Sequence, residues 1–183
     1  MMTDDEKIIF GKKAYTLEEM RGFTRGNAKD ILAVGFDLKK TFLFSDFDFM
    51  GGAFYQNVVQ ISRLITYNNS KAVFGFNDSD NIGKSHYVAV QSATAFATTF
   101  PHIFGPDQKK NVTIPSLIPC AIDQDPYFRV CRDVAPKLGY CKPALIHAKF
   151  FPALQGPGSK MSASIDSSAI FMNDTPKQMY ASW

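Results

Sequence analysis

One lysine and several hydroxyl side chains follow one another on a short segment late in the sequence. Residues 158–164 read GSKMSAS, so that Lys160, Ser162 and Ser164 stand among small neighbours. A lysine of this kind is a mobile cation with hydroxyl donors beside it, which suits it to wrap a triphosphate and to stabilise the charge on a leaving pyrophosphate. Composition alone favours a different interpretation, a flexible polar connection.

A second polar group stands where an apolar segment gives way to a helix signal. Asp123, Gln124 and Asp125 follow the apolar run SLIPCA, and Pro126 comes next. Asp125 before a proline is typical of a helix N-cap, so capping accounts for that residue. Gln124 has no such role. Its amide donates and accepts at once, which suits it to bind the ammonium or carboxylate of an amino acid.

The sequence lacks the residue patterns of several other catalytic classes. The triplet 83–85, Gly-Lys-Ser, resembles the end of a phosphate-binding P-loop, but Asp78 stands where that motif requires glycine. The histidines at 86, 102 and 147 do not form a metal-ligand pair, and no serine lies in a G-x-S-x-G elbow. For His147 we expect a hydrogen-bonded core histidine.

Composition indicates one folded domain in a reducing compartment. The chain has 183 residues, 45% of them hydrophobic, and a net charge of +3 that is too small and scattered to indicate a nucleic-acid surface. Its three cysteines are odd in number and show no disulfide or zinc spacing. The acidic start is unlike a signal peptide, and no apolar run is long enough for a membrane span. We expect a cytosolic protein.

The elements that position these residues alternate between helix and strand. The T-x-x-E box at 16–19 begins a helix that continues to Gly35. The remaining elements are predicted from periodicity and from turn residues: strands at 41–45, 116–121 and 143–147, and helices at 54–65, 126–139 and from 175 onward. This order predicts an α/β fold, a parallel sheet with helices on both faces, whose ligands lie beyond the carboxyl ends of the strands.

Several segments carry a resemblance to a known family. Residues 160–164, KMSAS, are similar to the KMSKS signature of class I aminoacyl-tRNA synthetases. Residues 2–7, 74–84, 117–140 and 142–156 resemble the eukaryotic-type tryptophanyl-tRNA synthetase family, in that family's order. The resemblance implies a Rossmann-like catalytic domain over 1–172, with the signature loop at 158–166, and the first turns of a helical anticodon-binding domain at 173–183.

The same resemblance implies a reaction. The tryptophan carboxylate would attack the α-phosphate of Mg²⁺-bound ATP, pyrophosphate would leave, and tryptophan would pass from the adenylate to tRNA(Trp). Such chemistry depends on positioning and electrostatic stabilisation more than on a general base. ATP with Mg²⁺ is then a substrate, no metal is permanently bound, and the protein is a cytoplasmic homodimer with no membrane partner.

Matching positions imply roles for single residues. Glu6 and Gln124 would hold the substrate ammonium, with Gln91 in the same polar cluster. The apolar wall against the indole would comprise Ile118, Cys120 and Phe128, with Cys120 as a packing residue and not a nucleophile. The ATP phosphates and adenine end would be contacted by Lys160, Met161, Ser162 and Ser164, of which Lys160, Ser162 and Ser164 are the catalytic candidates.

The sequence also departs from the family. Met1 replaces a glutamine that reads the indole N–H, Ile165-Asp166 replaces Asp-Pro, and nothing resembles the HIGH signature. The chain would then be about the second half of a catalytic domain and inactive in isolation. Two alternatives stay open: a non-catalytic truncated or degenerate module, and a tyrosyl-tRNA synthetase, which the segment AIDQDPYFRVCRDVAP disfavours.

Overall fold

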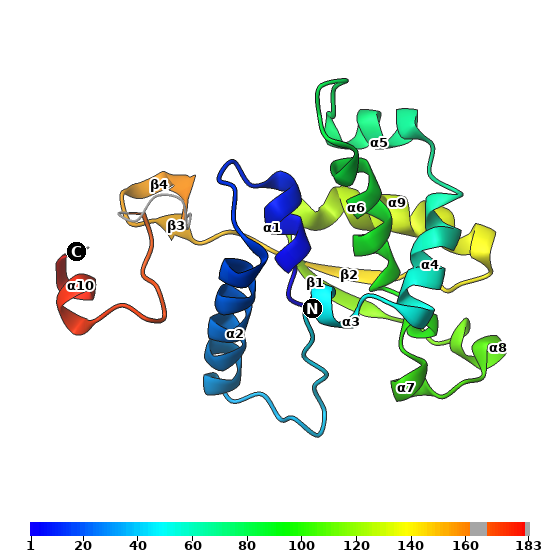
Figure 1. Ribbon diagram of the computed structural model, residues 1–183, viewed down its shortest axis with the longest axis horizontal. Coiled ribbons are helices and arrows are strands. Elements are labelled where there is room, and N and C mark those ends of the chain that lie inside the picture. Colours follow the sequence, from blue (N-terminus) through cyan, green and yellow to red (C-terminus); the bar gives the residue numbers. More distant parts are fainter. Residues whose placement is uncertain (162–167, 182–183) are drawn as a thin grey trace.

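The computed structural model describes residues 1–161 and 168–181, and helices dominate this part (Figure 1). The core is formed where α4 (Gly52–Ser62), α6 (Ile82–Ala93) and α9 (Asp125–Val134) pack together. Apolar side chains recur on one face of α4 at helical spacing, so that Phe54, Val58 and Ile61 are all almost completely buried. The helix predicted at 54–65 is confirmed, although it begins and ends slightly earlier.

A two-stranded parallel sheet lies against these helices. Strand β1 (Leu117–Ala121) pairs in register with β2 (Ala144–Ala148), so that Cys120 lies opposite His147. The connection runs through the 3-10 turn η2 (Ile122–Gln124), α9 and a second 3-10 turn, η3 (Ala135–Leu138). Gly139 follows in the left-handed conformation with φ 71° and stops the helix. Both predicted strands and the helix between them are confirmed.

The strand predicted at 41–45 is wrong. That segment forms a single parallel bridge between Met2 and Ser45, with the Met2 N–H donating to the Phe44 carbonyl at 2.8 Å. Its rings pack on other aromatic rings instead: Phe42 and Phe44 contact Phe49, and both contact Phe100. The aromatic residues of this segment therefore contribute to side-chain packing, and the segment does not form a strand of a sheet. The fold is mixed α/β and mostly helical, with a small sheet.

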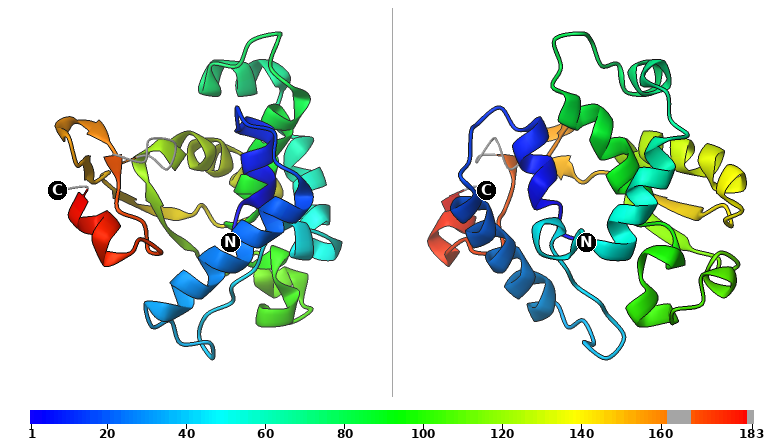
Figure 2. Two further views of the ribbon diagram at one scale, coloured as in Figure 1. Left: turned by 60° about the vertical axis from the view of Figure 1, so that its left-hand side comes forward. Right: turned by 45° about the vertical axis from the view of Figure 1, so that its right-hand side comes forward.

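Helices α1 (Asp4–Phe10), α2 (Leu17–Ala33) and α3 (Asp46–Phe49) precede the core helices in the chain. Helix α1 contacts both α6 and α3. Helix α2 begins with the predicted capping box: the Glu19 N–H donates to Thr16 Oγ1 at 3.2 Å, and the Thr16 N–H donates to Glu19 Oε2 at 2.8 Å. Only Met20 of α2 is buried, and Figure 2 shows this helix projecting from the helical body.

The last part of the chain lies away from that body (Figure 1). Strand β3 (Pro152–Ala153) pairs antiparallel with β4 (Gly156–Lys160), and α10 (Pro176–Ala181) confirms the helix predicted from residue 175. The predicted loop at 158–166 therefore begins inside a strand, because residues 158–160 belong to β4. The remaining elements are short: α5 (Tyr67–Phe74), η1 (Ala97–Thr99), α7 (Pro101–Phe104) and α8 (Gln108–Asn111). Within the described ranges, no helix has the length and apolar character needed to cross a membrane.

Candidate functional site

A cavity of about 490 Å³ opens between α1, α6 and the end of β1. All six residues assigned by resemblance to the amino-acid pocket line it, from five different elements: Glu6, Gln91, Ile118, Cys120, Gln124 and Phe128. These residues are up to 122 positions apart in the sequence, and the βαβ connection and α1 bring them together. The expected grouping of these side chains is therefore present in the fold.

Glu6 places a carboxylate at this cavity. The Thr3 hydroxyl, which also lines the cavity, donates to Glu6 Oε2 at 2.8 Å. Burial raises the pKa of Glu6, and the nearby charges of Asp5 and Asp123 raise it further. Among the residues that the structure describes, no lysine or arginine forms an ion pair with Glu6. A partly buried carboxylate that has no paired cation is suited to receive a ligand's ammonium group.

Gln91 presents an oriented amide from α6. The hydroxyl of Tyr87, one turn earlier, donates to Gln91 Oε1 at 3.0 Å. Burial raises the pKa of Tyr87 far above its usual range, so the phenol keeps its proton and stays a donor. Thr94 was not predicted as a site residue, yet it lines the cavity. Its hydroxyl donates to the main-chain carbonyl of Gln91 at 2.7 Å. Its i,i+3 spacing from Gln91 was the signal that sequence reasoning missed.

The opposite wall is apolar and partly aromatic. Ile118 and Cys120 are two positions apart on β1 and so face the same side, while Phe128 is 2% exposed. Burial raises the pKa of the Cys120 thiol, with a further contribution from Asp125. The thiol is therefore held neutral, as a packing residue requires. Phe44 and Phe100 also line the cavity and were not predicted as site residues, although both stand in aromatic-rich segments.

Asp125 does not cap α9 as predicted. The N-cap position belongs to Gln124, and no side chain bonds to the free N–H groups there. The Asp125 carboxylate instead lies 2.6 Å from Arg129 Nε and 3.0 Å from His147 Nε2. The Arg129 guanidinium and the His147 ring therefore occupy its two oxygens. The prediction of a core histidine at position 147 is wrong, because His147 is exposed on β2, where it lies against Asp125.

Two buried carboxyl groups, Asp5 and Asp46, lie on the helices α1 and α3. Asp46 on α3 is completely buried, and Asp5 on α1 accepts the Glu6 N–H at 2.7 Å. The pKa of Asp46 is raised to about 9, first because it is buried and then because it lies against the Asp5 carboxyl. Burial raises the pKa of Asp5 as well. This pair therefore holds a proton at neutral pH. A third buried carboxylate joins α1 to α3, because Asp4 Oδ1 accepts the Phe47 N–H at 3.2 Å.

We expect Asp46→Asn to stabilise the protein at alkaline pH. The folded pKa of about 9 exceeds the ordinary value of 3.8, so the folded state binds more protons than the unfolded state between these values, and stability falls as pH rises through this window. An amide carries no such penalty, so the gain should grow by about 1.4 kcal/mol for each pH unit between pH 5 and pH 8. Urea unfolding at pH 5 and pH 8 measures it.

The matched control for this prediction is Asp48→Asn, an exposed carboxylate on the same helix. It should leave the pH dependence of unfolding unchanged. A steep pH dependence that persists in Asp46→Asn would show that Asp46 is not the group that takes up the proton.

Two of the four residues assigned to ATP, Lys160 and Met161, lie in the part of the chain that the structure describes. Lys160 ends strand β4, where its backbone pairs with Pro152, and Met161 follows with its N–H donating to the Phe151 carbonyl at 3.4 Å. Ser162 and Ser164 lie outside the described residues. In the part of the chain that the structure describes, no three His, Cys, Asp or Glu side chains are grouped as metal ligands would be.

Comparisons with known proteins agree on one family. The model of "tRNA synthetases class I (W and Y)" matches residues 13–182. "Tryptophan–tRNA ligase, cytoplasmic" of Saccharomyces cerevisiae is 62% identical over 178 residues, which are 97% of this chain and 40% of the yeast protein. The human protein of the same name is 54% identical over 180 residues, covering 97% of this chain and 37% of its own length. The chain thus spans about 40% of these relatives.

Solved structures agree with the sequence relatives. The tryptophanyl-tRNA synthetase of Plasmodium falciparum superposes with a TM-score of 0.83 at 41% identity, over 98% of this chain and 45% of that one. A tryptophanyl-tRNA synthetase from Encephalitozoon cuniculi bound to tryptophan superposes with a TM-score of 0.83 at 37% identity, over 98% of this chain and 47% of that one.

Proposed function

We propose that the protein activates tryptophan with ATP and transfers it to tRNA(Trp). The premise is its family: the chain belongs to the class I tRNA synthetases of tryptophan and tyrosine and is homologous to tryptophan–tRNA ligases. The chain supplies the tryptophan pocket in large part and the loop that contacts ATP. The whole reaction is assigned to the full-length protein, of whose relatives this chain covers about 40%.

The cavity carries this proposal. It sets Glu6, Gln91 and Gln124 against the wall of Ile118, Cys120 and Phe128. An aromatic amino acid matches both parts: its ammonium pairs with the Glu6 carboxylate, its polar end meets the two amides, and its ring packs on the apolar wall. Bound in this way, the substrate has its carboxylate fixed in one place, which favours attack on the α-phosphate of ATP.

The segment after β4 is assigned to ATP. We place the phosphates and the adenine end against Lys160, Met161, Ser162 and Ser164, and Lys160 stabilises the charge on the leaving pyrophosphate. Mg²⁺ enters with ATP as part of the substrate and neutralises phosphate charge. The β3–β4 hairpin supports this role because it fixes the backbone at residue 160, from which the segment departs.

The wider organisation follows the same family. We assign residues 1–172 to a Rossmann-like catalytic domain with helices on both faces of its parallel sheet, and residues 173–183 to the start of a helical anticodon-binding domain. The protein acts as a homodimer in the cytoplasm, the location that the names of its relatives carry.

The test is pyrophosphate exchange into ATP by the full-length protein, with tryptophan or tyrosine as the only amino acid. We expect exchange with tryptophan and background with tyrosine. Exchange with tyrosine alone would assign the protein to the other branch of the family. Exchange with neither would favour a non-catalytic module, the outcome that Met1 favours, since this cavity residue has no hydrogen-bond donor in its side chain.

A further inference from the structure

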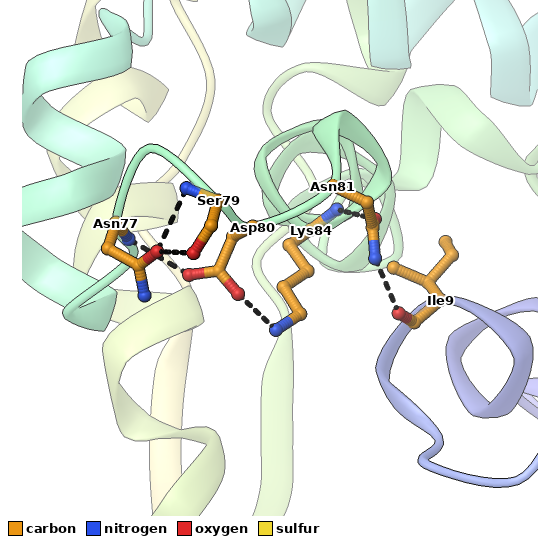
Figure 3. Close-up of polar contacts among 6 residues, drawn as sticks. All are labelled: Ile9, Asn77, Ser79, Asp80, Asn81 and Lys84. Carbon is orange, nitrogen blue, oxygen red and sulfur yellow. Dashed lines mark hydrogen bonds and ion pairs between the residues drawn. The ribbon is translucent and has the colours of Figure 1, made fainter.

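A polar loop between α5 and α6 holds the end of α1 (Figure 3). Within this loop, residues 77–81, Asn77 Oδ1 accepts the Ser79 N–H at 2.9 Å and Asp80 Oδ2 accepts the Asn77 N–H at 2.9 Å. The other oxygen of Asp80 pairs with the ammonium of Lys84 on α6. The loop is thus closed on itself and tied to the first turn of α6.

Asn81 connects this loop to α1. Its Oδ1 accepts the Lys84 N–H at 3.3 Å and so caps α6, while its Nδ2 donates to the Ile9 carbonyl at 3.0 Å. Carbonyls in the last turn of a helix have no intrahelical partner. One amide therefore satisfies the N-terminus of α6 and the C-terminus of α1 together, as Figure 3 shows.

The packing next to this amide is close. A Cβ at Gly83 would lie 3.0 Å from Asn81 Oδ1 and 3.2 Å from side-chain carbons of Ile9. Lys84, besides pairing with Asp80, lies over the ring of Phe10 with its Nζ 5.7 Å from the ring centre. The Gly-Lys-Ser triplet that resembles a P-loop thus has a packing role here, since its glycine and lysine hold α1 against α6.

The two helices joined by Asn81 carry two polar walls of the cavity. Glu6 lies on α1 and Gln91 on α6. Phe10 meets Tyr87 edge-on with ring centres 5.8 Å apart, and the Tyr87 hydroxyl donates to Gln91 Oε1. A shift of α1 along α6 would change the spacing between the Glu6 carboxylate and the Gln91 amide, the two groups that the proposed function assigns to the substrate's polar end.

We propose that Asn81 is a positioning residue for amino-acid binding, which sets the spacing of Glu6 and Gln91 through the α1–α6 junction. This inference rests on the proposed function. Because Glu6 and Gln91 are assigned to the amino acid, the inference predicts an effect on tryptophan binding and none on ATP binding. Loss of the Asn81 bridge weakens tryptophan binding and leaves the ATP contacts and the chemical step intact.

The test compares two variants that keep the helix cap. Serine and aspartate cap helices about as well as asparagine. Asn81→Ser is too short to reach Ile9, and Asn81→Asp places a carboxylate against the Ile9 carbonyl. Capping alone therefore predicts no change in either variant. The control is Thr66→Ala, which removes the N-cap hydrogen bond of α5 to the Asn69 N–H.

In exchange assays of the full-length protein, we expect the KM for tryptophan to rise about threefold in Asn81→Ser and about tenfold in Asn81→Asp. The kcat and the KM for ATP should stay within about twofold, and Thr66→Ala should match the unmodified protein. Unchanged tryptophan KM in both Asn81 variants would overturn the inference. Equal losses in kcat and in both KM values would overturn it too, because they indicate general loss of structure.

A second readout does not depend on catalysis. Amide hydrogen exchange of α1 should become faster in both Asn81 variants, while α9 keeps its protection. If the unmodified protein shows no tryptophan-dependent exchange of pyrophosphate, the proposed function fails. The α1–α6 junction is then tested by amide hydrogen exchange of α1 alone. Unchanged protection of α1 in the Asn81 variants would overturn the inference, and faster hydrogen exchange would confirm that Asn81 holds α1.

Discussion

Glu6→Gln is expected to lower kcat/KM for tryptophan about a hundredfold in pyrophosphate exchange. Truncating a charge-assisted hydrogen bond costs about 3 kcal/mol, and each 1.36 kcal/mol is a factor of ten. The carboxylate lies at the cavity, with a Thr3 hydroxyl donating to it and no lysine or arginine paired with it in the described residues. The loss should fall on tryptophan and leave the KM for ATP nearly unchanged.

The same substitution should also stabilise the fold. Burial raises the pKa of Glu6, so its ionised form costs folding free energy at neutral pH, and a neutral amide removes that cost. Glu18→Gln on α2 is the control, because that carboxylate is largely exposed. An activity of Glu6→Gln close to that of Glu18→Gln would remove Glu6 from the proposed site. Acidification should weaken tryptophan binding in the unmodified protein more than in the variant.

Lys160→Ala is expected to lower kcat by about two to three orders of magnitude, with a smaller effect on the KM for tryptophan. Removing one group that stabilises transition-state charge typically costs about 10²–10³ in kcat. Lys160 ends β4, at the start of the segment assigned to the ATP phosphates. Single-turnover formation of the adenylate measures this effect without contribution from product release.

Lys137→Ala is the matched control, because Lys137 is an exposed lysine on η3. It should retain full activity. A rate of adenylate formation for Lys160→Ala within a few-fold of this control would mean that Lys160 does not act on the leaving pyrophosphate. The similarity of KMSAS to KMSKS would then carry no function here.

Elements with local signals were predictable. The capping box at Thr16 and Glu19 needs only neighbouring residues, and it is present in the structure. Strands 117–121 and 144–148 are short apolar runs separated by a helix whose end is marked by Gly139. The grouping of Glu6, Gln91 and Gln124 at one cavity was predictable only by resemblance, because no local pattern reports contact across more than a hundred residues.

Features set by long-range contacts were not predictable. Residues 41–45 have the composition of a strand, but their rings pack against Phe49 and Phe100 instead. Asp125 has the position of a cap, yet its oxygens meet Arg129 and His147, the second of which is 22 residues away. In both cases a tertiary partner competes with the local preference and wins.

Calorimetric titration of the full-length protein with tryptophan, and then with tyrosine, tests the central claim most directly. The account predicts that tryptophan binds at one site per chain, that tyrosine does not compete at similar concentrations, and that Glu6→Gln weakens tryptophan binding about a hundredfold. Binding of tryptophan with equal affinity by Glu6→Gln would contradict the account, because the cavity of Glu6, Gln91 and Gln124 would then not be where the amino acid is held.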